Sequence, residues 1–144
     1  MRDEIIENKK KWLYRYRNNS EKISRLREKL VTLEARITSI RSPNYSGMPR
    51  GSSPVTIGDL LSDKEELEKR IERLEETGRK YRREILEAID TLEDSKHAEV
   101  LERWFIFGSS ADQIGEAIGY STRYIFVLYS DALRDIVLPG TTEN

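Results

Sequence analysis

Apolar residues recur every three or four positions through most of the chain, a spacing typical of amphipathic helices. Between residues 5 and 40 they follow a seven-residue repeat with two apolar columns, the pattern of a coiled-coil seam. One column is Tyr16, Ile23, Leu30 and Ile37, and the other is Ile5, Trp12, Asn19, Leu26, Leu33 and Ile40. The repeat predicts one long helix over residues 3–41.

Asn19 is the polar member of this seam. A buried Asn at a seam position commonly selects the register or orientation of the paired helices, at some cost in stability. An Asn in a frayed or exposed part of the seam fits the pattern equally well. The sequence leaves both interpretations open.

A second seam predicts a helix over residues 62–92, with Ser62 as its cap and Glu65 at the capping-box position. Its apolar positions are Leu67, Ile71, Leu74, Tyr81, Ile85, Ala88 and Leu92. Gly78 interrupts the seam, where Ala would favour a helix by roughly 1 kcal/mol, so we expect either a close approach or a weak point there. Residues 42–58 contain three prolines and three glycines, a composition that favours a disordered loop.

Two helices of similar length joined by a loop fold back most simply as a long antiparallel helical hairpin, here over residues 1–93. Residue 41 would then face residue 62. This register places two basic clusters, residues 9–11 and 79–83, toward the end of the hairpin that leads into the C-terminal region. A parallel coiled coil between two chains is the alternative, and it would remove this register.

The region 94–137 predicts a small helix-turn-helix module, followed by a tail over residues 138–144. Asp94 or Ser95 can cap its first helix, Ser110 with Gln113 has capping-box spacing, and Ser121 can cap the last helix. We expect a left-handed turn at Gly119 and a tight crossing at Gly115. A short helix, a glycine turn and a longer helix are typical of DNA-binding modules. An ordinary corner in a three-helix core is the other interpretation.

Charge is distributed unevenly along the chain, although the net charge is only −1. Residues 1–41 hold 12 basic and 6 acidic residues, whereas residues 94–144 hold 4 basic and 8 acidic residues. Non-specific affinity for DNA comes mainly from Lys and Arg that neutralise phosphates. The module that resembles a DNA reader therefore needs cations from elsewhere in the chain.

We predict that the last helix presents the DNA-contacting surface. Arg123 is placed for a bidentate contact with guanine, apolar side chains can contact thymine methyls, and the helix starts offer amides to phosphate. The predicted contact residues are Ser110, Ser121, Thr122, Arg123, Tyr124, Phe126, Val127, Tyr129 and Ser130. Accessory phosphate contacts are predicted at Lys9, Lys10, Lys11, Arg15, Arg79, Lys80, Arg82 and Arg83.

Each of these assignments has a simpler alternative. Lys9, Lys10 and Lys11 can be a solvated helix face, and Trp12 and Tyr16 fit best as hairpin anchors. An outward Phe126 is also suited to a protein partner, because exposed apolar patches often mark interfaces.

The stretch "IDTLEDSKHAEVLERWFIFGSSADQIGEAIGYSTRYIFVLYSDAL" resembles the region-4 domain of bacterial sigma factors, which reads the promoter −35 element. Over nearly its full length the chain is similar to the phage-encoded RinA/ArpU-type transcriptional regulators, through the segments "LYRYR" and "SGMPRG" and the sigma-like end. This resemblance implies activation of late or integrase-type phage promoters. The helical patterns predict an all-α fold, and the leading hypothesis has double-stranded DNA as a partner and RNA polymerase as a candidate second partner.

Other features exclude or weaken several classes. The sequence has no cysteine, no apolar N-terminal leader and no stretch that could span a bilayer, so we expect a cytoplasmic protein without membrane contact. No phosphate loop, nucleophile triad or metal cluster is apparent; His97 fits as a helix-start residue, and we expect neither enzymatic activity nor a cofactor. Two alternatives remain: an adaptor that binds polymerase or a sigma factor without reading DNA, and a small terminase-like packaging subunit. The coiled-coil helices also allow a homo-oligomer.

Overall fold

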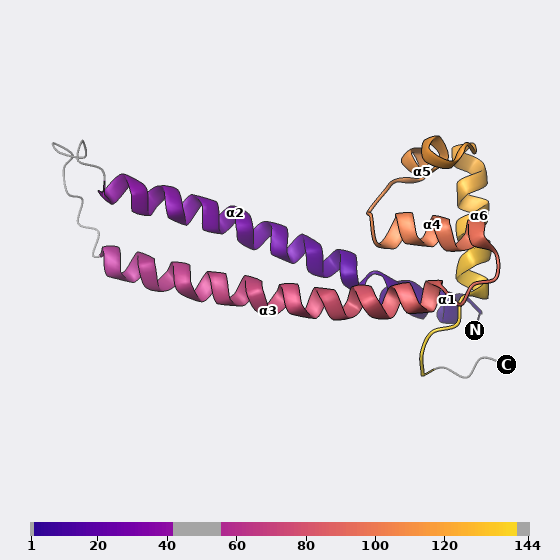
Figure 1. Cartoon of the computed structure of the whole chain (residues 1–144), viewed down its shortest axis with the longest axis horizontal. Coiled ribbons are helices and arrows are strands. Elements are labelled where there is room, and N and C mark those ends of the chain that lie inside the picture. Colours follow the sequence, from indigo (N-terminus) through magenta and orange to yellow (C-terminus); the bar gives the residue numbers. More distant parts are fainter. Residues whose placement is uncertain (1, 42–55, 141–144) are drawn as a thin grey trace. The chain divides into compact units, whose positions relative to one another are not determined.

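A computed structural model describes residues 2–41 and 56–140, which contain six α-helices and no strand (Figure 1). The predicted all-α class is confirmed. The helices are α1 (Arg2–Leu13), α2 (Arg15–Arg41), α3 (Ile57–Ile89), α4 (Ser95–Phe105), α5 (Ala111–Ile118) and α6 (Thr122–Asp135). The prediction of disorder for the loop falls mainly on residues 42–55, which lie outside the described residues.

The predicted helix over residues 3–41 is interrupted at Tyr14, which separates α1 from α2. The backbone hydrogen bonds on either side persist, from Tyr14 N to Lys10 O and from Asn18 N to Tyr14 O. The Tyr14 ring packs edge-on against Phe105, at 4.9 Å between ring centroids. Tyr14 thus contacts α4 where α1 and α2 meet, and a heptad pattern gives no sign of the interruption.

The start of α3 also differs from the prediction, because Ser62 lies inside the helix. Asp59 N donates to Thr56 Oγ1, and Thr56 N donates to Asp59 Oδ2, so these two residues form the reciprocal cap. The helix therefore begins at Ile57, within the predicted loop 42–58, and it ends at Ile89 instead of residue 92.

The chain divides into two compact units: residues 1–19 with 78–144, and residues 20–77. This division does not coincide with the predicted boundary at residue 93, because α1 and the end of α3 pack with the C-terminal helices. The hydrophobic core of the first unit joins α1, α3, α4, α5 and α6. Its fully buried members include Leu13, Ile85, Leu101, Phe105, Ile114, Ile125 and Leu133. Leu138, predicted to begin the tail, is also buried.

In the second unit, two ion pairs join α2 and α3 in antiparallel order, Arg27 with Glu75 and Glu34 with Lys64. Its buried apolar residues within the described part are Leu26, Ile37, Leu60 and Ile71. Ile23, Leu30, Leu33, Leu67 and Leu74 are only half-buried. Two helices alone thus leave part of this seam open to solvent.

Gly78 marks a close approach between α2 and α3 within the first unit, one of the two outcomes expected for it. A Cβ built at Gly78 would lie 2.7 Å from Asn19 Nδ2. Asn19 itself is buried, so the interpretation of an Asn in an exposed part of the seam is wrong.

Candidate nucleic-acid interface

Helix α6 presents one face to solvent and one to the core. Phe126 and Val127 are large apolar residues with 50% and 47% of their surface exposed. The other exposed residues of this face are Thr122, Arg123, Tyr124 and Ser130. Arg123 forms no ion pair within the described part of the chain. Its guanidinium is therefore available to an external acceptor.

Tyr129 does not belong to this face, and the prediction that it points outward is wrong. Only 8% of its surface is exposed, and its ring stacks on Trp104 with centroids 4.0 Å apart. Burial, and then the neighbouring Tyr14 hydroxyl, raise the pKa of the Tyr129 phenol well above its usual range. Tyr129 is a core residue and cannot contact a base without local unfolding.

Trp104 links this core to the exposed face. Its other side meets Phe126 edge-on, at 6.1 Å between centroids, and its indole Nε1 donates to Tyr14 Oη at 3.0 Å. Edge-to-face aromatic pairs contribute about 0.5–1.5 kcal/mol beyond the area they bury. Phe126 is thereby held in place although half of its surface is exposed, and the sequence did not mark Trp104 as its support.

The two predicted serine caps are present. Ser110 Oγ accepts from Gln113 N, with Gln113 Oε1 accepting from Ser110 N in return, and Ser121 Oγ accepts from Tyr124 N. Both hydroxyls are therefore engaged with the first turns of their own helices. Thr122 Oγ1 donates to Asp112 Oδ1 at 2.6 Å, which joins the start of α6 to the start of α5.

The turn between α5 and α6 depends on two glycines. Gly119 has φ +83° and donates its N–H to Gly115 O, as the left-handed cap of α5. At Gly115, a Cβ would lie only 2.4 Å from the carbonyl oxygen of Tyr120. The close contact expected at Gly115 is present, but its nearest atom belongs to the turn between α5 and α6 and not to helix α6 itself. These contacts fix the direction in which α6 leaves α5 (Figure 1).

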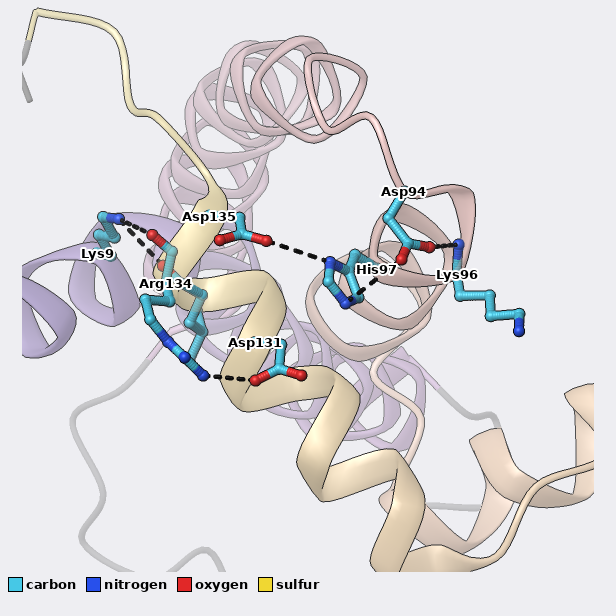
Figure 2. Close-up of polar contacts among 8 residues, drawn as sticks. Lys9, Asp94, Lys96, His97, Asp131, Arg134 and Asp135 are labelled. Carbon is cyan, nitrogen blue, oxygen red and sulfur yellow. Dashed lines mark hydrogen bonds and ion pairs between the residues drawn. The ribbon is translucent and has the colours of Figure 1, made fainter.

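Lys9, predicted as a phosphate contact, is buried. Its ammonium donates to the carbonyl oxygens of Leu133 and Arg134, both at 3.1 Å (Figure 2). A cation at the C-terminal end of a helix is stabilised by the helix dipole and satisfies carbonyls that lack a partner in the helix. Lys9 therefore joins α1 to the end of α6, and its prediction as a surface contact is wrong.

Arg15 is also engaged inside the protein. Its guanidinium pairs with Glu84 at 3.0 Å, its Nε donates to Trp12 O, and it lies over the rings of Trp12 and Tyr81. Arg15 is therefore held within the protein by these contacts, and its predicted phosphate contact stays a prediction.

The remaining predicted cations are at or near the surface. Lys10 is half-buried and lies 3.5 Å from Glu7, whereas Lys11 is exposed. Arg79, Lys80, Arg82 and Arg83 are exposed on α3 and form no ion pair within the described residues.

A groove of about 800 Å³ separates α1 from α6 and gathers cations that the sequence did not place together. Arg2 and Lys10 of α1 line it with Ser130 and Arg134 of α6, and so does the carboxylate of Asp3. Arg134 also pairs with Asp131. Ser130 and Arg134 follow Arg123 by seven and eleven positions, so all three fall on one stripe of α6. That spacing is visible in the sequence, whereas the position of α1 beside α6 is not.

On another side of α6, His97 of α4 lies between two carboxylates (Figure 2). Its Nε2 is 3.7 Å from Asp94 Oδ2, and its Nδ1 is 3.6 Å from Asp135 Oδ2. Asp94 caps α4 as one of the two residues predicted for this role, and the hydrogen bond from Lys96 N is the main reason that its pKa is lowered. The described residues contain no group of side chains suited to a metal ion.

In comparisons with models of protein families, with curated proteins and with solved structures, this chain matches none. Within residues 2–41 and 56–140, no helix has the length and apolar character needed to cross a membrane.

Proposed function

We propose that this protein is a DNA-binding transcriptional regulator in which the exposed face of α6 reads promoter DNA in the major groove. The observation that carries the proposal is the exposed stripe Arg123, Phe126, Val127 and Ser130, which stands on a fully buried core. A reading helix must be held rigidly while its outward side chains remain free. Both conditions hold for α6.

Each side chain of the stripe has a use in the major groove. The guanidinium of Arg123 can donate to O6 and N7 of a guanine, and Phe126 and Val127 can contact thymine methyl groups. Thr122 and Ser130 can bond base edges or phosphates. The polar and apolar residues together favour a site that contains both guanine and thymine.

The attraction to phosphate, on this proposal, comes from the α1–α6 groove. Arg2, Lys10 and Arg134 lie beside the end of the reading stripe, where Lys9 holds the two helices together. Each cation that neutralises a phosphate releases a counterion and steepens the salt dependence of binding. The cluster Arg79–Arg83 is a further source of positive charge on α3.

The resemblance to RinA/ArpU-type regulators and to sigma region 4 supports a role at phage promoters, with RNA polymerase as a protein partner. An adaptor that binds polymerase or a sigma factor without reading DNA is the second candidate. The exposed apolar surface of Tyr124, Phe126 and Val127 favours it, because such patches are common at protein interfaces.

The test is a binding titration of the full chain against pooled host and phage DNA fragments at two salt concentrations. We expect one set of fragments to be enriched at both. Replacing Arg2 and Lys10 by Ala should lower affinity for all fragments alike and reduce the salt slope by about one per cation lost. The matched control is Lys69→Ala, a solvent-exposed cation of the second unit paired only with Glu65.

Absence of DNA retention at low salt, together with retention of polymerase or a sigma factor, would favour the adaptor. An unchanged salt slope in the Arg2 and Lys10 variant would remove the groove from the proposal. The same experiment on Lys80→Ala with Arg83→Ala then decides whether α3 supplies the phosphate contacts.

A further inference from the structure

The second unit has two unlike sides along the seam between α2 and α3. The ion pairs of Arg27 with Glu75 and of Glu34 with Lys64 close one side. The other side carries a groove of about 600 Å³ with Leu33 and Leu67 in its lining. Both leucines are only half-buried. The apolar seam is therefore covered on one side and accessible on the other.

The rim of this groove is basic. Arg25, Lys29 and Arg36 of α2 line it, against the single carboxylate of Glu28. None of the three cations forms an ion pair within the described part of the chain. An occupant that covers the leucines would also meet three unpaired positive charges, so its matching surface should be apolar with acidic flanks.

Helix α3 of the same unit has that character. Between residues 57 and 77 it holds eight acidic and four basic residues. Asp59, Asp63 and Glu66 are spaced by four and three positions, which places them on one stripe that continues to Arg70, and Asp63 stacks one turn from Leu67. Leu67 is the residue of α3 that lines the groove, and Asp63 flanks it one turn away. The groove thus has a basic edge on α2 and a carboxylate beside its α3 edge, which makes Arg36 and Asp63 complementary between two copies.

We propose that two copies of this chain associate through these grooves, with α2 of each copy packed against α3 of the other in a four-helix bundle. A two-fold axis parallel to the helices brings the same surface from both copies together. It also keeps every residue at its own level along the bundle. Because residue 34 lies level with residue 64 within one copy, Arg36 of one copy comes level with Asp63 of the partner.

Such a pairing covers the part of the seam that two helices leave open. The four leucines, Leu33 and Leu67 from each copy, would form the centre, and the Arg36–Asp63 contacts would form its edges. Exposed ion pairs contribute little to affinity, so the leucines should supply most of it and the charges should set the alignment.

The test is sedimentation of the full chain over a range of concentrations, without DNA, so that its outcome is independent of the proposed function. The wild type should be dimeric, and Leu33→Ser should weaken the dimer at least tenfold. Val31→Ser is the matched control, because Val31 is an apolar residue of the same helix, 65% exposed, that does not line the groove. Circular dichroism checks that each variant keeps its helix content.

The charge contacts give a second measurement that does not disturb the seam. Arg36→Glu alone and Asp63→Arg alone should each weaken the dimer, because each sets like charges opposite one another. A mixture of these two variants should form a heterodimer, since both contacts then regain opposite charges. A wild type that sediments as a monomer at every concentration would overturn the proposal. Equal effects of Leu33→Ser and Val31→Ser, or a mixture that fails to pair, would also overturn it.

Discussion

The two units of this chain bury their apolar residues to very different extents. In the first, five helices converge on a continuous core in which Leu13, Phe105 and Ile125 are completely covered. In the second, two helices cover Leu26, Ile37, Leu60 and Ile71 and leave other seam positions half-exposed. The first unit can fix the position of α6 by itself, whereas the second leaves apolar surface that a partner could cover.

The comparison predicts that substitutions at close contacts in the first unit have the largest effects. Gly115→Ala should destabilise that unit by about 3 kcal/mol, because the added Cβ meets a backbone carbonyl that cannot rotate away. Hydrogen exchange of α4, α5 and α6 should accelerate, while the amides of residues 20–41 keep their wild-type rates. Gly119→Ala is the control, with open space around its Cβ and a cost of about 1 kcal/mol from its positive φ. Equal losses in both variants would contradict the close approach.

Substitution of Lys9, whose ammonium is buried, should have the second-largest effect on stability. Lys9→Met removes two hydrogen bonds to the end of α6 and leaves the Leu133 and Arg134 carbonyls without this donor. We expect a loss of about 2 kcal/mol in denaturant unfolding. Lys11→Met, at an exposed neighbouring position, should change stability by less than about 0.5 kcal/mol. A neutral Lys9→Met would mean that α1 is not anchored to α6.

Gly78→Ala should have a smaller effect, because the nearest atom belongs to a side chain that can move. Its Cβ would lie 2.7 Å from Asn19 Nδ2, and this crowding opposes the roughly 1 kcal/mol that Ala gains in a helix. We expect net destabilisation of about 1 kcal/mol. A double-mutant cycle with Asn19→Ala should show strong coupling between the two positions. Additive effects would exclude a direct contact.

The smallest expected effect is on the change of thermal stability at acidic pH. The pKa of Asp94 is lower in the folded state than its ordinary value of 3.8, so the carboxylate contributes stability above that pH. This contribution is lost as pH falls below 3.8 toward the folded-state pKa. Asp94→Asn should therefore flatten the decline in thermal stability on acidification, as measured by circular dichroism. An unchanged slope would show that the cap has no ionic component.

The spacing of residues close together in the sequence correctly predicted the helix caps of the C-terminal module and the glycine turn, which depend only on neighbouring positions. The caps at Ser110 and Ser121, the left-handed Gly119 and the crowding at Gly115 each follow from a few adjacent positions. The sequence assigns Lys9 to the surface as part of the basic cluster 9–11, and Tyr129 because other residues of its helix fit the inward face better. Each is buried through a partner from a distant element: the α6 carbonyls for Lys9, and Trp104 for Tyr129. The interruption at Tyr14 likewise leaves no periodic sign in the sequence.

The central claim is that the outward face of α6 distinguishes DNA sequences while cations beside it supply general affinity. Its most direct test compares Arg123→Ala with Arg103→Ala, an arginine of the same unit that pairs with Glu99 on α4. Affinities are measured for a preferred fragment and for a scrambled one at the same salt concentration. Loss of the guanine contact should cost about 1–3 kcal/mol on the preferred fragment and little on the scrambled one, with Arg103→Ala near wild type. Equal losses on both fragments, or no loss on either, would contradict the claim.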